Sequence, residues 1–270
     1  MRCKTLILLA LTALAGFPPQ AKAGDINLGT AGNFAVLAGS TVTNTNTPTV
    51  INGGDVGLSP GNSITGFPPG TITPPYTMQI ANGVALQAQN DLTTAYNQAA
   101  GLPFTQNLTG QDLGGLTLTP GVYYFSSSAG LTGTLTLNEQ GNPNAQFVFQ
   151  IGSTLTTASD SSVVTELTGT SGPTPGGCNV FWQVGSSATL GTGTAFEGHI
   201  LALTSITMDT GATILDGSAL ARNGAVTLDD NTITNCVSAV PEPSTMTLAL
   251  IGGALLGLPA LGKRLLRLAA

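Results

Sequence analysis

Few residues of this 270-residue chain could do acid–base chemistry. Glu197 and His199, with Gly198 between them, form the only acid–histidine pair, and in a strand both side chains would face the same side. Such a pair could move a proton, but neither a nucleophile motif nor a second histidine accompanies it. The alternative is a structural histidine with satisfied ring nitrogens. We therefore expect no catalytic residue and predict that the protein is not an enzyme.

Carboxylates are the other reactive groups, and four lie near one another in sequence: Asp209, Asp216, Asp229 and Asp230. Acidic turns of some β-helices bind calcium, but these carboxylates lack the regular ligand spacing of a calcium loop. Two cysteines are fewer than the four ligands of a structural zinc site. Glycine-rich runs such as GLTGTL lack the lysine of a phosphate-binding loop. We expect neither a metal ion nor a cofactor.

Threonine supplies the side-chain chemistry that is abundant here, as the stretch TMDTGATILDGSALA (207–221) shows. Each threonine offers a methyl and a hydroxyl, and β-branching holds the side chain in few rotamers. Threonines repeated on adjacent strands would stand about 4.7–4.9 Å apart, which predicts a flat ladder able to order water. The alternative is a purely structural ladder, because threonine is common in strands.

Short strands separated by turns must position these threonines. FVFQIGSTLTT (147–157) matches VFWQVGSSATLGT (180–192), and ATLGTGTAFEGHILA (188–202) matches ITMDTGATILDGSALA (206–221). Thr189, Thr207 and Thr227 recur at spacings near 19 residues, which is typical of one coil of a β-solenoid. Small residues such as Ala202 and Ala221 would let the coils pack closely. A β-sandwich is the alternative.

One segment predicts a helix instead. Residues 77–100 lack proline, and Pro74-Pro75 precedes them while Gly101 and Pro103 follow. Apolar residues recur at helical spacing, with polar Gln and Asn residues expected to face water. The apolar positions are Ile80, Val84, Ala88, Leu92, Ala95, Tyr96 and Ala99.

Charge and cysteine content limit the partners. Charged residues make up 7% of the chain, and Arg222 is the only basic residue between 24 and 239 apart from His199. A body without a basic patch cannot neutralise phosphates, so nucleic acid is excluded as a partner. Cys178 and Cys236 form an even pair that predicts a disulfide in an oxidising compartment. Two free buried thiols are the alternative.

The N-terminus has the three parts of a secretory signal peptide. Arg2 and Lys4 precede an apolar run, and Ala21-Lys22-Ala23 forms a cleavage site. We expect residues 1–23 to be removed and residues 24–239 to lie outside the inner membrane.

The C-terminus contains an uncharged apolar stretch, residues 245–262, that is long enough to span a bilayer as a helix. The basic residues that follow it would keep this end cytoplasmic. They are Lys263, Arg264 and Arg267. An ordinary stop-transfer anchor would fit this pattern.

A short motif, Pro241-Glu242-Pro243, precedes the apolar stretch. Residues 240–267 as a whole resemble the PEP-CTERM sorting signal of Gram-negative bacteria. The resemblance implies cleavage by an exosortase, transient insertion of residues 245–262 in the inner membrane, and delivery to the cell surface or release.

Residues 27–235 resemble the bacterial and fungal ice-binding protein family. The resemblance lies in LGTAGNFAVLAGSTVTN, PGVYYF, AQFVFQIGSTL, CNVFWQVGSSATLGTGTAFEGHILALTSITM and GSALARNGAVTLDDNTIT. It implies a secreted protein whose domain, residues 24–239, is a right-handed discontinuous β-helix of triangular cross-section. One long helix would pack alongside, and a flat, regular face would bind ice.

Some family members carry a Thr-Ala/Gly-x-Thr/Asn pattern on that face. Thr210-Gly211-Ala212-Thr213 matches it in full, whereas the stretches 192–195, 154–157 and 229–232 match it in part. The resemblance therefore implies an ice-binding site composed of Thr154, Thr157, Thr192, Thr194, Ala195, Thr210, Thr213 and Thr232.

Two functions follow from these observations. The first is a secreted ice-binding protein that inhibits ice growth or recrystallisation, or attaches a cell to ice. The alternative is a structural or adhesive protein of the cell surface with exopolysaccharide as its partner, since the sorting signal accompanies exopolysaccharide production.

Overall fold

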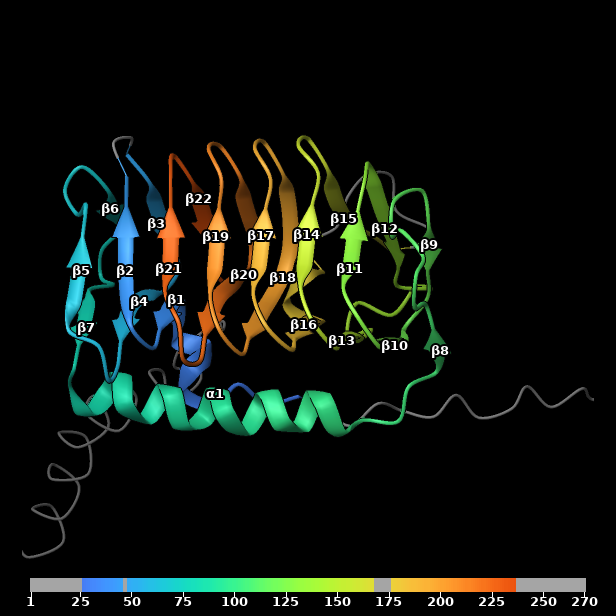
Figure 1. The fold of residues 1–270 in the computed structure, drawn as a ribbon, viewed down its shortest axis with the longest axis horizontal. Helices are drawn as coiled ribbons and strands as arrows, with labels where there is room; N and C mark the ends of the chain where they lie inside the picture. The colour runs from blue at the N-terminus through green and yellow to red at the C-terminus, as the bar shows by residue number, and fades with distance from the viewer. Residues whose placement is uncertain (1–25, 46–47, 168–175, 237–270) are drawn as a thin grey trace, which may run out of the picture.

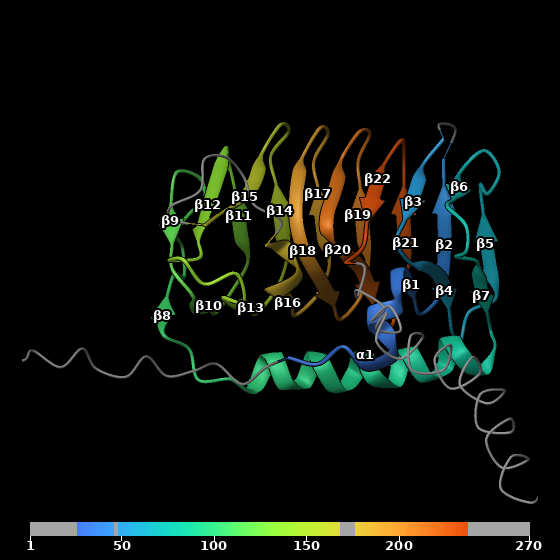
Figure 2. The ribbon, with the colours of Figure 1, turned by 180° about the vertical axis from the view of Figure 1, so that it is seen from behind.

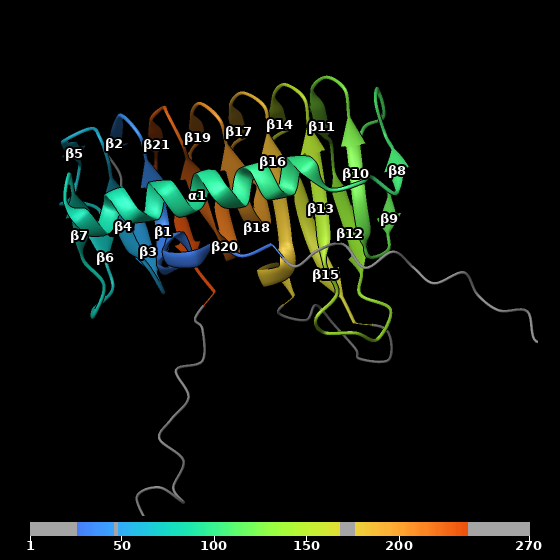
Figure 3. The same ribbon diagram turned by 90° about the horizontal axis from the view of Figure 1, so that it is seen from below.

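The computed structural model describes residues 26–45, 48–167 and 176–236. Parallel strands lie side by side in a long stack, and α1 (Gly83–Gly101), the α-helix of the described residues, runs along its length (Figure 1). Figure 2 shows the same stack from behind, and Figure 3 shows from below how α1 crosses successive strands. The predicted mainly β fold with one helix is confirmed. The expected signal peptide and sorting segment, residues 1–23 and 240–267, lie outside the described residues.

One side of the stack is a seven-stranded parallel sheet, in the spatial order β11-β14-β17-β19-β21-β2-β5. Each strand has three or four residues, so alternate residues give one or two outward positions per coil. They are β2 (Thr41–Asn44), β5 (Ser63–Thr65), β11 (Ala129–Leu131), β14 (Leu155–Thr157), β17 (Ala188–Leu190), β19 (Ile206–Met208) and β21 (Val226–Leu228).

A fifteen-stranded sheet forms the two other sides. One of them is covered by α1 and is called the helix side below; the other is called the lateral side. The helix side contains β1 (Phe34–Ala38), β4 (Asp55–Leu58), β7 (Met78–Ile80), β8 (Gln106–Asn107), β10 (Gly121–Phe125), β13 (Phe147–Ile151) and β16 (Val180–Val184). The lateral side contains β3 (Val50–Asn52), β6 (Thr71–Ile72), β9 (Thr117–Leu118), β12 (Thr134–Asn138), β15 (Ser162–Glu166) and β22 (Thr232–Thr234).

Two long strands, β18 (Ala195–Ala202) and β20 (Thr213–Ala221), bend from the lateral side onto the helix side. Their first halves pair with lateral strands, as Ser162 does with Ala195, and their second halves pair with β16 and β1. The register shifts between Glu197 and His199, where Gly198 has a φ of +98°. A Cβ on Gly217 would lie 1.9 Å from the Gly198 carbonyl oxygen, so this bend requires glycine.

The first coils of the chain pair with the last ones. Val36 pairs with Ala219, Val42 with Val226, and Ile51 with Ile233. The blue N-terminal strands therefore lie beside the red C-terminal strands in Figure 1, and α1 then carries the chain back to the far end of the stack.

Apolar side chains from all three sides fill the interior of the stack. An aromatic stack runs through it from Tyr123 to Phe149, Trp182 and Phe196, with ring centroids 5.4, 3.8 and 4.9 Å apart in turn. Ala202 and Ala221 are paired and fully buried, as their small size predicts. A second apolar cluster lies between α1 and the helix side.

The helix begins later than the predicted residue 77. Residues 78–80 form β7, which pairs with β4, and the Asn82 side chain then caps the helix by accepting the Ala85 N–H at 2.9 Å. Ile80 and Val84 are 40% and 52% exposed, so their assignment to the apolar face is wrong. Gln89, in contrast, is buried, and it donates to the Ala221 carbonyl at 3.1 Å.

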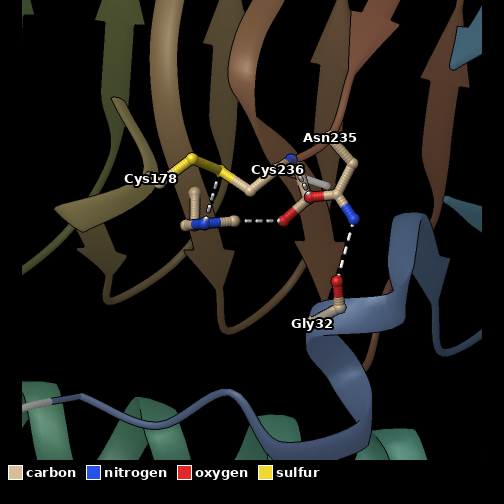
Figure 4. The surroundings of a disulfide bond; sticks show 6 residues. Gly32, Cys178, Asn235 and Cys236 are labelled. Atoms are coloured by element: carbon tan, nitrogen blue, oxygen red, sulfur yellow. Dashed lines mark hydrogen bonds between the residues drawn. A yellow bond between two sulfur atoms is a disulfide. The ribbon is translucent and has the colours of Figure 1, made fainter. Parts of the chain in front are cut away.

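The predicted disulfide between Cys178 and Cys236 is present (Figure 4). Cys178 lies in the short 3₁₀ helix η2 (Gly177–Asn179), at the bend of β18 and β20, where Gly177 approaches Gly198. Cys236 follows β22. The neighbouring Asn235 donates to the Gly32 carbonyl in η1 (Gly29–Asn33) at 2.8 Å, and its own N–H bonds Asn52. The junction joins the first and last coils.

Buried ionisable groups lie beside this junction. Glu197 is 7% exposed, and one of its carboxylate oxygens has no hydrogen-bond partner in the described part of the chain. Burial raises the pKa of Glu197 to about 7; hydrogen bonds from Thr165 oppose the rise, while the charges of Asp216 and Glu139 add to it. Burial lowers the pKa of His199 to about 4.

The raised pKa of Glu197 predicts a pH-dependent stability. A carboxyl whose pKa is higher in the folded state than its ordinary 4.5 stabilises the fold below pH 4.5 and loses that contribution as the pH rises through 7. The free energy of unfolding of Glu197→Gln, relative to that of the wild type, should therefore be higher at pH 8 than at pH 5 by roughly 2–4 kcal/mol. Urea unfolding at both pH values measures this difference.

Glu166→Gln, which neutralises an exposed carboxylate on β15, is the matched control and should leave the pH dependence unchanged. An identical pH dependence in Glu197→Gln and the wild type would contradict the assignment.

Candidate functional site

A row of threonines crosses the outward face of the seven-stranded sheet. Six consecutive strands each carry a threonine that pairs with the threonine of the next strand. We call this set the threonine row; in spatial order it is Thr156, Thr189, Thr207, Thr227, Thr43 and Thr65. Gly130 of β11 continues the row at one end.

The register of the strands fixes the spacing of the row. Adjacent parallel strands lie about 4.7–4.9 Å apart, so the six side chains form a straight line at that repeat. On either side of each threonine, residues such as Ile206 and Met208 point inward and are fully or almost fully buried. These buried neighbours prevent the strands from rotating, and β-branching restricts the threonine rotamers.

A second row of small residues, all of which carry a hydroxyl except Ala225, runs parallel to the first, two positions earlier in each coil. Because side chains alternate along a strand, residues two apart face the same side, roughly 6.5–7 Å apart. Ser128 and Thr154 hydrogen-bond through their hydroxyls at 2.8 Å, and Thr41 pairs with Ser63. The row consists of Ser128, Thr154, Ser187, Ser205, Ala225, Thr41 and Ser63.

The surface made by the two rows is uncharged. None of the residues in the seven strands is Asp, Glu, Lys, Arg or His. Carboxylates lie at the borders of this surface: Asp209 and Asp229 follow β19 and β21, and Asp112 pairs with Gly130 at the β11 end. Thr210 donates its hydroxyl to Asp229. Such a face can order water through methyl groups and hydroxyls without binding ions.

The structure distributes the eight residues of the predicted site over different surfaces. Thr154 belongs to the second row on the seven-stranded sheet. Thr192 and Thr210 lie in exposed turns. Ala195, Thr213 and Thr232 form a row on the lateral side, where each pairs with the next. These eight residues therefore do not form one surface.

Two of the predicted residues are buried and cannot contact ice. Thr194 is fully buried and Thr157 is 3% exposed. Their hydroxyls bond each other at 2.8 Å, and Thr157 also accepts the Gly191 N–H at 2.9 Å. Their assignment to a surface site is wrong, because both serve to close the turn between the seven-stranded sheet and the lateral side.

The lateral row is less regular than the threonine row. Val50 interrupts it beyond Thr232, and Leu215, two residues after Thr213, is 48% exposed. Glu197 follows Ala195 by two residues and is buried. Apolar and acidic residues thus break the pattern that the seven-stranded sheet keeps.

The acid–histidine pair of the sequence does not come together. The bend at Gly198 separates the two side chains: Glu197 faces Thr165, while the His199 ring lies 2.8 Å from the Ser218 hydroxyl and 3.7 Å from Cys236 Sγ. His199 and Ser218 are both buried, out of reach of a substrate. In the described ranges, no three His, Cys, Asp or Glu side chains are grouped to hold a metal ion.

In the part of the chain that the structure describes, no helix is long and apolar enough to cross a bilayer. The apolar stretch 245–262 lies outside these residues.

The four-residue sequence motif identified none of the six residues of the threonine row. Of the second row it identified Thr154 alone. The repeat near 19 residues already placed Thr189, Thr207 and Thr227 in equivalent positions. Each stands between two apolar residues, in ATL, ITM and VTL, which is the pattern of an outward residue on a half-buried strand. This alternation, followed along all coils, identifies the row.

Comparison with known proteins gives a consistent result. The model of the "Ice-binding-like" family matches residues 36–234. The chain is 56% identical over 263 residues to an ice-binding protein of Nostoc sp. (strain HG1), covering 94% of this chain and 93% of that protein.

Solved structures are similar as well. One is a crystal structure of an ice-binding protein from an Antarctic biological consortium, at 46% identity and a TM-score of 0.70, covering 86% of this chain and 96% of that one. Another is from the Antarctic ascomycete Antarctomyces psychrotrophicus, at 43% identity and a TM-score of 0.71, covering 78% and 98%. Since the family model matches most of the chain and the relatives match along their length, this chain belongs to the ice-binding-like family.

Proposed function

We propose that this protein binds ice through the threonine row of its seven-stranded sheet. The observation that carries the proposal is the register of six threonines on six consecutive strands, on a face without charge. Relatives whose names describe them as ice-binding proteins support it, as they share more than half of the sequence or the same fold.

The row would act by holding water in an ordered array. Each hydroxyl anchors a water molecule, and each methyl favours a cage of water around itself. Because the threonines already occupy few rotamers, little side-chain entropy is lost when water is ordered. No acid, base or nucleophile takes part, so we propose a non-enzymatic role.

The route of the protein is proposed from the sequence. Removal of residues 1–23, export of residues 24–239, and exosortase processing at residues 240–267 would place the domain outside a Gram-negative cell. The sorting motif alone supports exopolysaccharide as a partner. The winding of the coils we propose to be right-handed, since parallel strands joined by a crossover take that hand.

A bulky residue in the threonine row should abolish ice binding. Thr207→Tyr places a ring at the middle of the row and should raise the concentration needed to inhibit ice recrystallisation by about tenfold or more, as loss of a central contact does at other interfaces. Ice recrystallisation inhibition and thermal hysteresis measure the effect, with circular dichroism to verify the fold.

Thr213→Tyr is the matched control, because Thr213 pairs with Thr232 on the lateral side. It should leave the activity unchanged. Loss of activity in Thr213→Tyr with retention in Thr207→Tyr would move the site to the lateral side.

The uncharged surface predicts activity that does not depend on pH. Between pH 5 and pH 8 no group of the seven strands titrates, so recrystallisation inhibition by the folded protein should stay constant. Assays in buffers of equal ionic strength test this, with the folded fraction measured alongside. A change that follows a single titration would show that a carboxylate such as Asp229 takes part.

A further inference from the structure

The disulfide encloses the part of the chain that carries the centre of the threonine row. Cys178 and Cys236 are 58 residues apart, and the loop they close contains β16 to β22. Thr189, Thr207 and Thr227 all lie within this loop. The other three threonines of the row lie outside it.

The disulfide also lies away from the threonine row. Cys178 belongs to η2, and η2 packs where β18 and β20 bend from the lateral side to the helix side. That bend is the corner opposite the seven-stranded sheet. A force applied to the chain beyond Cys236 therefore enters the domain at the corner farthest in the fold from the proposed ice-binding surface.

The last strand is weak against such a force. β22 has three residues, Thr232–Thr234, and pairs with β20 and β3 through few backbone hydrogen bonds. Without a disulfide, a pull on residue 236 would break these bonds one after another and then reach β21, which carries Thr227. The row would lose its centre first.

With the disulfide, the pull passes from Cys236 directly to Cys178. The loop of residues 179–235 then cannot be peeled away from its C-terminal end, and its inability to extend withholds about 200 Å of chain. Asn235 also holds this end of the chain, because its side chain donates to Gly32 of η1 and its N–H donates to the carbonyl of Asn52 in β3.

From this geometry we propose that the Cys178–Cys236 disulfide is a mechanical latch. It keeps the centre of the threonine row folded when the protein is bound to ice and pulled through its C-terminal end. The proposal rests on the proposed ice binding, because the ice surface holds the protein while its C-terminal end is pulled. A disulfide that served only folding stability would protect against a pull from either end of the chain alike.

Beads carrying the full chain test the latch on ice. The chain is attached through a biotin at its C-terminus or, as a control, at its N-terminus, with wild-type cysteines or with Cys178→Ser and Cys236→Ser together. Flow then detaches the beads from an ice surface. For C-terminal attachment the serine variant should detach at lower flow stress, by a factor on the order of two or more, because forced unfolding follows the unfolding barrier. For N-terminal attachment both forms should detach alike.

Recrystallisation inhibition by the free protein separates the two proposals. Equal inhibition by both forms shows that the site is intact without the disulfide, so a difference on beads is mechanical. If wild-type beads do not adhere to ice at all, the proposed function fails. If the serine variant detaches early from both ends, or from neither, the latch is wrong.

Two further measurements test the latch if the serine variant folds poorly or if the wild type does not adhere to ice. Beads loaded with oxidised wild-type protein can be treated with a thiol reductant after attachment, and the same asymmetry between the two ends should appear. In an optical trap with handles at both ends, reduction should add an early low-force step that the oxidised chain lacks. Absence of that step would overturn the latch without reference to ice.

Discussion

Each coil pairs in parallel with the next, residue against residue, and this register decides what every side of the stack presents. Because equivalent residues stand one above another, a residue type that recurs at the same position of each coil forms a continuous row along the surface. Outward threonine becomes the threonine row, and inward leucine, isoleucine and valine become a continuous core. Sheets of many strands normally twist, and stacked coils with side-chain ladders are among the arrangements that keep a sheet flat. Flatness, core and surface thus share one cause.

Much of the fold follows from repeats that can be found in the sequence. The matches between residues 147–157 and 180–192, and the recurrence of small residues at Ala202 and Ala221, indicate stacked coils before any coordinates are known. The helix begins later than predicted because Asn82, several residues beyond Pro74-Pro75, provides the N-cap, and residues 78–80 pair with β4 instead. Sequence periodicity does not rank such competing local choices. The closing of the stack between β3 and β22 was not predictable from local sequence, since its partners lie far apart in the chain.

The surface was harder to predict than the fold. The four-residue pattern from Thr210 to Thr213 covers a turn and the start of β20. Residues of that strand alternate between the lateral surface and the interior of the stack. Burial of Thr157 and Thr194 shows the difficulty: the same residue type closes a turn in one position and faces solvent in the next. The register across coils distinguishes the two positions, and a four-residue pattern does not contain it. Glu197 and His199 illustrate the same point, because one glycine bend removes the neighbourhood that their spacing suggested.

The pairing of the first coils with the last has a consequence for the order of folding. β1, β2 and β3 emerge first during synthesis, yet their partners β20, β21 and β22 are made last. Contacts between residues so distant in sequence form slowly, since a long loop must close before they are gained. The coils between residues 105 and 221 can stack as they appear, and β1, β2 and β3 can pair early with β4, β5 and β6, but the two groups of coils join only through β20, β21 and β22. The stack is completed only when residue 234 is available, so until then the N-terminal coils are joined to the later coils by α1 but lack part of their strand pairing.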